Sequence, residues 1–307
     1  MNKNNNAVAA SNVRIGINPL TWTNDDLPSL GADTPLEVCL SEARQAGYSG
    51  IELGNKFPRD PVVLGPILQK HDLSLVSGWY SARLMERSVE EEIAAMQDHL
   101  NLLKALGSDV MVFAEVTNCI HGDQSAPLSQ RPGMTELQWV EYAKRITQVA
   151  DYMAEQGVKL AYHHHMGTVI ETAEEVDKLM AMTGNNVGLL LDTGHITFAG
   201  GNPLEMAKKH AQRIVHVHCK DIRPSILKDN LNRDSAFLNA VLDGVYTVPG
   251  DGSIDYAPIF DVLKSVDYQG WIVVEAEQDP AIAHPLTYAT MGYKYLSSNL
   301  QQAGFAI

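Results

Sequence analysis

The sequence has few cysteines and no long apolar run. Its 307 residues include only three cysteines, Cys39, Cys119 and Cys219, which lie far apart. An odd number of widely spaced thiols argues against a disulfide framework and favours a reducing, cytoplasmic location. No apolar run reaches the roughly 18 residues that a membrane-spanning helix needs, so no membrane segment is expected. The chain starts with a polar stretch that lacks the apolar core of a secretion signal, and we expect residues 1–12 to form a disordered tail.

Positive charge is also scarce. Lysine and arginine number 23 against 37 aspartates and glutamates, which gives a net charge of −14. Because no basic stripe is available to attract phosphates, neither a nucleic acid nor an anionic membrane is an expected partner. In other respects the composition, with 45% hydrophobic and 20% charged residues, is typical of a soluble globular protein.

Short apolar segments alternate with helical patterns along the chain. The eight segments that read as buried strands are 14–18, 50–53, 73–79, 109–115, 158–163, 187–192, 214–219 and 271–275. Helical patterns cover 35–47, 61–71, 88–106, 135–156, 172–182, 203–212, 256–266 and 285–303. Such alternation implies parallel strands joined by right-handed crossovers. It predicts an α/β protein with a single (β/α)8 TIM barrel domain over residues 13–307.

An open, doubly wound sheet is the competing architecture. Its phosphate-binding variants carry a glycine-rich turn after the first strand, and Ile17-Asn18-Pro19-Leu20 offers none. Two long connections, 116–133 and 222–255, interrupt the regular alternation, and the second contains a helical piece. Loops of this length in a compact domain are usually functional or disordered.

Ionisable residues gather where the predicted strands end. Asp192, His218 and Glu275 end three successive strands, and Tyr162-His163-His164-His165 ends the strand before them. The carboxyl ends of barrel strands form the active face, and mixed nitrogen and oxygen ligands suit a divalent metal such as Mn, Co, Fe, Zn or Mg. A lone aspartate there could equally cap a helix, and a lone histidine could be a core residue. Four such groups at four successive strand ends favour a metal site.

Side chains alternate along a strand, so His163 and His165 share one side and His164 points away. We therefore predict His163 as the fourth metal ligand. The predicted catalytic residues are His165, His195, Lys220 and Glu275, which could move protons or hold an anionic oxygen. The predicted substrate-binding residues are Glu52, Trp79, Glu115 and Arg223. Glu52 and Glu115 could equally be salt-bridge partners at the rim, and Trp79 could simply pack in the core.

The motifs around these residues resemble a known family. Leu189-Leu190-Leu191-Asp192-Thr193-Gly194-His195, His216-Val217-His218-Cys219-Lys220-Asp221 and Gly270-Trp271-Ile272-Val273-Val274-Glu275 are similar to the xylose-isomerase-like sugar isomerase and epimerase superfamily of TIM barrels. Within it, Tyr162-His163-His164-His165-Met166-Gly167-Thr168 and Val274-Glu275-Ala276-Glu277-Gln278-Asp279-Pro280 resemble the inosose dehydratase family. The likeness runs from about Val13 to Phe305.

This resemblance implies a metal site of the type Glu, Asp, His, Glu. Asp192, His218 and Glu275 match that pattern, and His163 stands where the first glutamate is expected. The resemblance further implies Mn or Co as the metal, a dependence on glutathione, and a small cyclic polyol ketone as substrate. The implied reaction is the dehydration of 2-keto-myo-inositol to a trihydroxycyclohexane-1,2-dione.

Rival functions remain open at this point. A ketose or keto-polyol isomerase or epimerase would use the same metal site but would prefer paired carboxylates, which His163 disfavours. An endonuclease of the same superfamily would need a basic groove, which the net charge disfavours. A non-enzymatic binding barrel would have no reason to place ionisable groups at four strand ends. A homo-oligomer is possible, since barrels of this size often pair.

Overall fold

The computed structural model describes residues 12–307, so the predicted tail over residues 1–12 lies outside the described residues except for Asn12, which pairs with Ala306. Within the described residues, eight parallel strands close into a barrel in the order β1-β10-β7-β6-β5-β4-β3-β2. The predicted TIM barrel is confirmed. The strands are β1 (Val13–Ile17), β2 (Gly50–Leu53), β3 (Ser74–Ala82), β4 (Val110–Glu115), β5 (Lys159–His163), β6 (Val187–Asp192), β7 (Ile214–Cys219) and β10 (Gly270–Val274).

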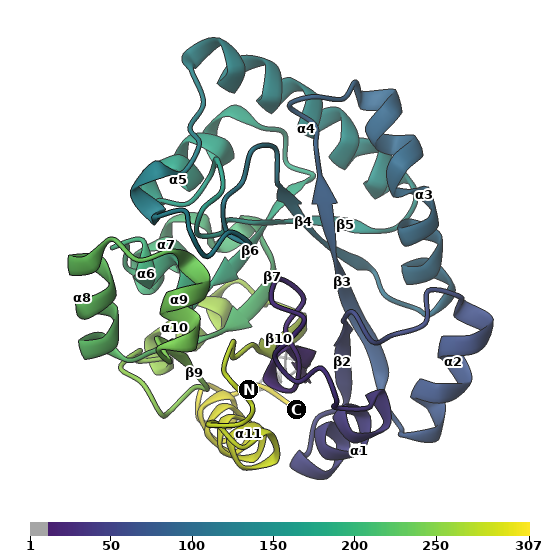
Figure 1. The fold of residues 1–307 in the computed structure, drawn as a ribbon. Coiled ribbons are helices and arrows are strands. Elements are labelled where there is room, and N and C mark those ends of the chain that lie inside the picture. The colour runs from purple at the N-terminus through teal and green to yellow at the C-terminus, as the bar shows by residue number, and fades with distance from the viewer. Residues whose placement is uncertain (1–11) are drawn as a thin grey trace, which may run out of the picture.

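Helices surround the barrel, as Figure 1 shows. Those that follow the predicted pattern are α1 (Leu36–Ala46), α2 (Pro61–Lys70), α3 (Val89–Ala105), α4 (Glu136–Glu155), α5 (Ala173–Met182), α7 (Pro203–His210), α10 (Ala257–Ser265) and α11 (Pro285–Gln302). Three of them begin with a capping box, and the one at Ser88 and Glu91 was expected from the sequence. Such reciprocal side-chain bonds satisfy backbone N–H groups that have no partner inside the helix.

Several short elements lie outside the predicted strands and helices, although a helical piece was expected in the connection from 222 to 255. The short helix α6 (Thr193–Phe198) starts directly at the end of β6, because the Asp192 carboxylate accepts the backbone N–H of His195 at 2.8 Å. The connection from 222 to 255 holds two helices, α8 (Pro224–Arg233) and α9 (Phe237–Leu242), and its ends pair as the small antiparallel strands β8 (Asp221–Ile222) and β9 (Tyr246–Thr247). This insertion lies to one side of the barrel in Figure 1 and has its own apolar cluster.

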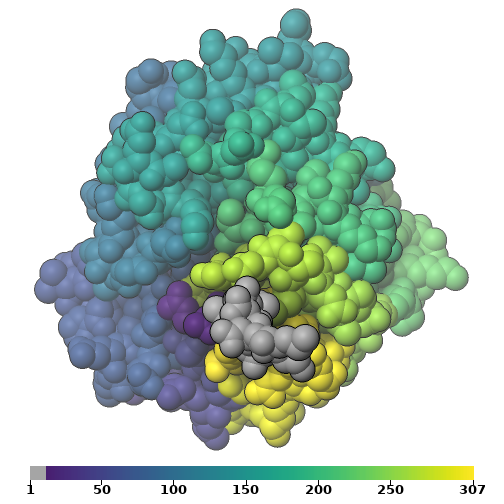
Figure 2. All heavy atoms as spheres, turned by 180° about the vertical axis from the view of Figure 1, so that it is seen from behind, coloured from purple at the N-terminus to yellow at the C-terminus, as the bar shows by residue number. Residues whose placement is uncertain are grey.

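The two ends of the described chain lie together. Strand β1 pairs with β10 and closes the barrel, and Figure 2 shows the first and last segments side by side on one face. The barrel is therefore closed by residues that lie far apart in the sequence.

Apolar side chains fill the amino-terminal end of the barrel interior. Trp271, Val76 and Val273 form one cluster there. Gly50 makes room for it, since a Cβ at that position would lie 2.5 Å from the Trp271 ring. The larger apolar core lies between strands and helices. The buried ionisable residues of the interior lie toward the carboxyl ends of the strands.

Candidate metal centre and active site

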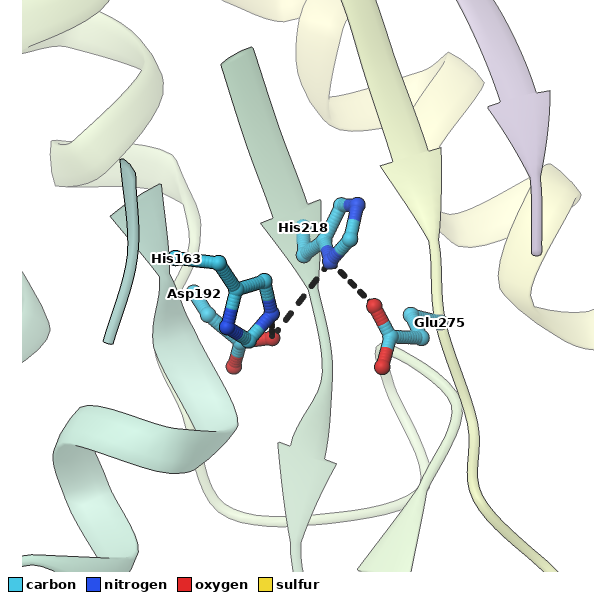
Figure 3. Close-up of side chains that lie close together, drawn as sticks. All are labelled: His163, Asp192, His218 and Glu275. Carbon is cyan, nitrogen blue, oxygen red and sulfur yellow. Dashed lines mark ion pairs between the residues drawn. The ribbon is translucent and has the colours of Figure 1, made fainter. Parts of the chain in front are cut away.

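Four buried side chains converge at the carboxyl end of the barrel. His163 ends β5, Asp192 ends β6, His218 lies in β7 and Glu275 follows β10 directly. Each offers one ligand atom, and these atoms all lie within 4.8 Å of one another. Figure 3 shows the four side chains facing one space. The four residues predicted as metal ligands are thus brought together, because parallel strands end at the same rim.

The contacts within this group fit a shared cation. The Asp192 Oδ2 oxygen lies 3.5 Å from His163 Nε2 and 3.6 Å from His218 Nδ1, and a Glu275 oxygen lies against the same His218 nitrogen. Neither Asp192 Oδ2 nor His218 Nδ1 makes a hydrogen bond, although both are buried. Buried polar atoms without partners are costly. Two nitrogens and two carboxylates around one point are a suitable donor set for a divalent transition metal.

The side chains of the three consecutive histidines point in alternate directions, as strand geometry requires. A cavity opens beside the metal-ligand group, and Glu52, Trp79, His218 and Glu275 are among the residues that line it. His163 and His165 also line this cavity, whereas His164 does not. His165 Nδ1 lies 2.8 Å from the Met166 carbonyl, which can only accept, so Nδ1 carries the proton and Nε2 keeps a free lone pair. Burial lowers the pKa of His164 to about 3, and neither of its ring nitrogens has a hydrogen-bond partner.

A buried ammonium group lies behind the carboxylates. The Lys220 Nζ is 2.7 Å from Glu275 Oε1, 2.8 Å from Glu277 Oε2 and 2.9 Å from His195 Nε2. Burial by itself lowers the pKa of Lys220, but the two carboxylates raise it above its usual range. His195 accepts from Lys220, and its other nitrogen lies 3.1 Å from the Tyr246 hydroxyl.

His165, His195 and Glu277 form a second group of ligand-type side chains. The Lys220 ammonium already contacts His195 and Glu277. A positive charge is therefore held there by the chain itself. Neither Lys220 nor His195 lines the cavity, so both lie one layer behind it.

Two predicted substrate-binding residues line the cavity. The Trp79 ring packs edge-on against the rings of His163 and His165, at centroid distances of 5.3 and 5.6 Å. Glu52 also lines the cavity, but its oxygens already accept hydrogen bonds from several side chains.

Glu115 and Arg223, also predicted to bind substrate, do not reach this cavity. Glu115 sits at a strand position that points to the helical layer, and its oxygens accept the backbone N–H groups of Leu84 and Thr117 at 2.8 and 3.0 Å. Burial raises its pKa to about 7. The Arg223 guanidinium holds the insertion together, with bonds to the Gly244 carbonyl at 2.8 Å and to Asp251 at 2.7 Å.

Sequence reasoning missed four polar residues that line the cavity: Asn18, Asp25, Asp26 and Glu277. The spacing of Glu277 gave a usable signal, since it lies two residues after Glu275 and so repeats the alternation of a strand. The other three lie in or beside the loop after β1, where no periodic pattern indicates which way a side chain points.

The chain is similar over nearly its whole length to a rhizopine catabolism protein and to inosose dehydratases. It is 51% identical to the rhizopine catabolism protein MocC of Rhizobium meliloti over 295 residues, which covers 96% of this chain and 91% of MocC. It is 44% identical to the inosose dehydratase of Clostridium perfringens over 288 residues, 93% of this chain and 97% of that one. The inosose dehydratase of Geobacillus thermodenitrificans is 44% identical over 286 residues, 92% and 96% of the two chains.

Solved structures share the fold at low sequence identity. An L-ribulose 3-epimerase has a TM-score of 0.67 and 19% identity, with 95% of each chain covered. The IOLI protein, solved with a zinc atom, has a TM-score of 0.68 and 18% identity, with 96% of this chain and all of that chain covered. The model of the xylose isomerase-like TIM barrel family matches residues 40–297. The chain therefore belongs to the xylose isomerase-like TIM barrel family and groups there with the inosose dehydratases and MocC.

Proposed function

We propose that this protein is a hydro-lyase that removes water from 2-keto-myo-inositol in inositol catabolism and yields a trihydroxycyclohexane-1,2-dione. The observation that carries the proposal is the 44% identity, over more than nine-tenths of the chain, to inosose dehydratases of several species. The buried group of His163, Asp192, His218 and Glu275 supports it independently, because it offers a metal site of the kind that activates a ketone.

The four side chains of this group would hold Mn or Co. When bound, the ion supplies a Lewis acid that polarises the substrate ketone. Trp79 forms a flat apolar wall beside the two cavity-lining histidines. The carboxylates of Asp25 and Asp26 line the same cavity. They are suited to accept the ring hydroxyls.

The chain's own groups would carry out the elimination. His165, with its free Nε2, or Glu275 removes the proton from the carbon next to the ketone. The C–O bond at the following carbon then breaks, a C=C bond forms, and the departing hydroxyl takes a proton and leaves as water. The enol that results tautomerises to the dione.

The proton for the departing hydroxyl would come through Glu277, the cavity-lining member of the cluster with Lys220 and His195. From the sequence, His195 and Lys220 were expected to move protons or hold an anionic oxygen themselves. Because both lie behind the cavity, we propose that they act through Glu275 and Glu277, by keeping these carboxylates paired and in position.

The test is an absorbance assay. Protein stripped with a chelator and reloaded with Mn or Co is mixed with 2-keto-myo-inositol, and the ultraviolet absorbance of the conjugated product is followed. Absorbance that grows only with metal is the expected result. No absorbance, but a changed sugar by chromatography, would replace the proposal by a ketose or keto-polyol isomerase or epimerase. No conversion with any metal would overturn the reaction altogether.

The 51% identity to MocC favours rhizopines as a second candidate class of substrate. A rhizopine or a keto derivative of it, added to the same assay, tests whether the chain serves rhizopine catabolism instead. If that compound were turned over faster than 2-keto-myo-inositol, it would replace 2-keto-myo-inositol as the proposed substrate.

Further parts of the proposal concern the cellular setting. We propose a cytoplasmic enzyme that acts on a small molecule without nucleic-acid or membrane partners, forms a homo-oligomer, and depends on glutathione. Among residues 12–307, the structure has no helix with the length and apolarity that crossing a bilayer requires. Measuring the activity of metal-loaded protein with and without glutathione tests the dependence on glutathione. Measuring the molecular mass of the protein in solution tests whether it forms a homo-oligomer.

A further inference from the structure

Glu52 is a buried carboxylate inside the barrel, and every oxygen of it is engaged. It lies on β2 and is 2% exposed. Its Oε2 accepts from the Asn18 amide at 2.7 Å, and its Oε1 accepts from the Ser77 hydroxyl at 2.5 Å. Its other two partners are His216 at 2.8 Å and His218 at 3.1 Å. A carboxylate already satisfied by four donors has little capacity left for a substrate hydroxyl.

The bond to His218 crosses the barrel interior. Strands β2 and β7 are not neighbours in the sheet, since β1 and β10 lie between them. His218 directs Nε2 to Glu52 and Nδ1 to the space shared by Asp192 and Glu275. Because an ionised carboxylate only accepts, the bond to Glu52 keeps a proton on His218 Nε2, and Nδ1 is the nitrogen that a cation between Asp192 and Glu275 would bind in place of a proton that faces the Glu275 oxygen. Glu52 thus selects the tautomer of His218 that can bind a cation in the ligand group.

His216, two residues before His218 on β7, also holds the Glu52 carboxylate in place. Its Nε2 donates to Glu52, and its buried Nδ1 has no hydrogen-bond partner. Because a second N–H, on that buried Nδ1, would have no acceptor, the ring carries its single N–H on Nε2, where Glu52 accepts it. A neutral ring with that tautomer leaves no donor unsatisfied. The Glu52 carboxylate is therefore held by donors from β3, from β7 and from the residue after β1.

Glu52, His216 and His218 also satisfy the distance criterion for a metal group of their own. The hydrogen-bond distances account for their proximity without an ion, and the Ser77 and Asn18 donors would point at the same oxygens that an ion would need. Hydrogen bonding is thus the simpler explanation of the Glu52, His216 and His218 contacts.

We propose that Glu52 is the positioning residue of the metal centre: it holds His218 with Nε2 protonated and Nδ1 facing Asp192 and Glu275, while Ser77, Asn18 and His216 hold Glu52. The inference rests on the metal site of the proposed function but not on the reaction. Carboxylate partners of metal-bound histidines typically contribute 10–100-fold in metal affinity.

The first test measures metal affinity. Glu52→Gln keeps the size of the side chain but loses the negative charge and one of the two acceptor oxygens. Asn18, which donates to Oε2, and Ser77, His216 and His218, which donate to Oε1, would then compete for a single neutral oxygen, so the bond to His218 weakens. Cobalt or manganese binding by calorimetry, in competition with a chelator, should weaken about 10–100-fold relative to the unaltered chain. The matched control is Glu92→Gln, because Glu92 is equally buried and hydrogen-bonded to Tyr80 and Arg83 but lies in the helical layer. The control should bind metal as tightly as the unaltered chain.

A second measurement needs no variant. In zinc-loaded protein labelled with nitrogen-15 at histidine, the spectrum of His218 should show a protonated, hydrogen-bonded Nε2 and a metal-bound Nδ1. Metal on Nε2, or equal affinity in Glu52→Gln and the unaltered chain, overturns the inference while leaving the metal site intact. If the unaltered chain binds no metal, the metal site of the proposed function fails, and this inference with it.

Discussion

At the level of single residues, the three adjacent histidines show how alternation along one strand places identical side chains in different environments. Their backbone positions differ by one residue each, and alternation alone sends His163 and His165 into the cavity and His164 out of it. His163 faces Asp192, whereas His165 is fixed by the Met166 carbonyl. Adjacent, chemically identical side chains therefore offer a direct experimental comparison.

His163→Ala should lose most of its affinity for Mn or Co, because one of four ligands is gone. His165→Ala should keep that affinity but lose about 10²–10⁴-fold in kcat, the usual contribution of a general base. His164→Leu should retain both, since neither His164 nitrogen has a partner to lose. Metal titration and steady-state kinetics on the three variants separate these outcomes. A His165→Ala protein with full kcat would assign the base to Glu275.

Glu115 offers a second residue-level prediction, on stability. Burial raises its pKa from the usual 4.5 to about 7. An acid whose pKa is raised on folding is neutral in both states at low pH and costs nothing there. As pH rises from about 4.5 to 7, the unfolded chain ionises first, and folding stability is lost.

In Glu115→Gln this loss cannot occur, so the free energy of unfolding of the variant should rise relative to the unaltered chain by about 2 kcal/mol between pH 5 and pH 8. Urea denaturation at the two pH values measures the difference. Glu90→Gln, at an exposed position on α3, is the control and should show no such change. Parallel pH curves for Glu115→Gln and the unaltered chain would contradict the prediction.

At the level of elements, helix α6 is packed directly onto the buried lysine. A Cβ added at Gly194 would lie 2.5 Å from Lys220 Cγ and 2.8 Å from its Cβ. The first turn of α6 therefore requires a residue without a side chain, although alanine is the better helix former.

Gly194→Ala should displace Lys220 from Glu275 and Glu277, lower kcat about tenfold or more, and cost about 1–3 kcal/mol of stability through overpacking. Gly133→Ala is the control, because nothing lies within 4 Å of a Cβ at that position. Kinetics and thermal unfolding of the two proteins check this. Unchanged kcat in Gly194→Ala would mean that the position of Lys220 is not critical to the reaction.

The elements that sequence reasoning predicted are those with regular periodicity over their whole length. The barrel strands and the long helices fall in this group, with ends within a few residues; the largest difference is β3, which extends to Ala82. Helix α6 was missed because a glycine lies in its first turn and because its start depends on Asp192, which also belongs to a strand. The two-residue strands β8 and β9 form only because they pair with each other, and they are too short to show a periodic pattern in the sequence.

At the scale of the whole molecule, the candidate site was predictable where strand ends define it. His163, Asp192, His218 and Glu275 were found because all parallel strands of a barrel end at one rim. Glu115 also ends a strand, but its alternation points it outward. Arg223 follows β8, and its partners come from the far end of the insertion, which local pattern cannot indicate.

Metal binding at this rim should stabilise the entire barrel. The four proposed ligands come from β5, β6, β7 and the residue after β10, so one ion would link segments spread from residue 163 to residue 275. An ion that binds only the folded chain stabilises it by about 2.7 kcal/mol at a concentration 100 times its Kd, which corresponds to a rise in Tm of about 5 °C for a domain of this size. Chelator-treated protein should therefore unfold at a lower temperature, and Mn or Co should restore the Tm.

Asp192→Asn should remove most of this shift in Tm. Asp123→Asn, which changes an exposed residue in the loop after β4, should keep it. Because the described residues offer two other groups of possible ligands, around Glu52 and around Glu277, a full shift in Asp192→Asn would locate the ion in one of those groups instead.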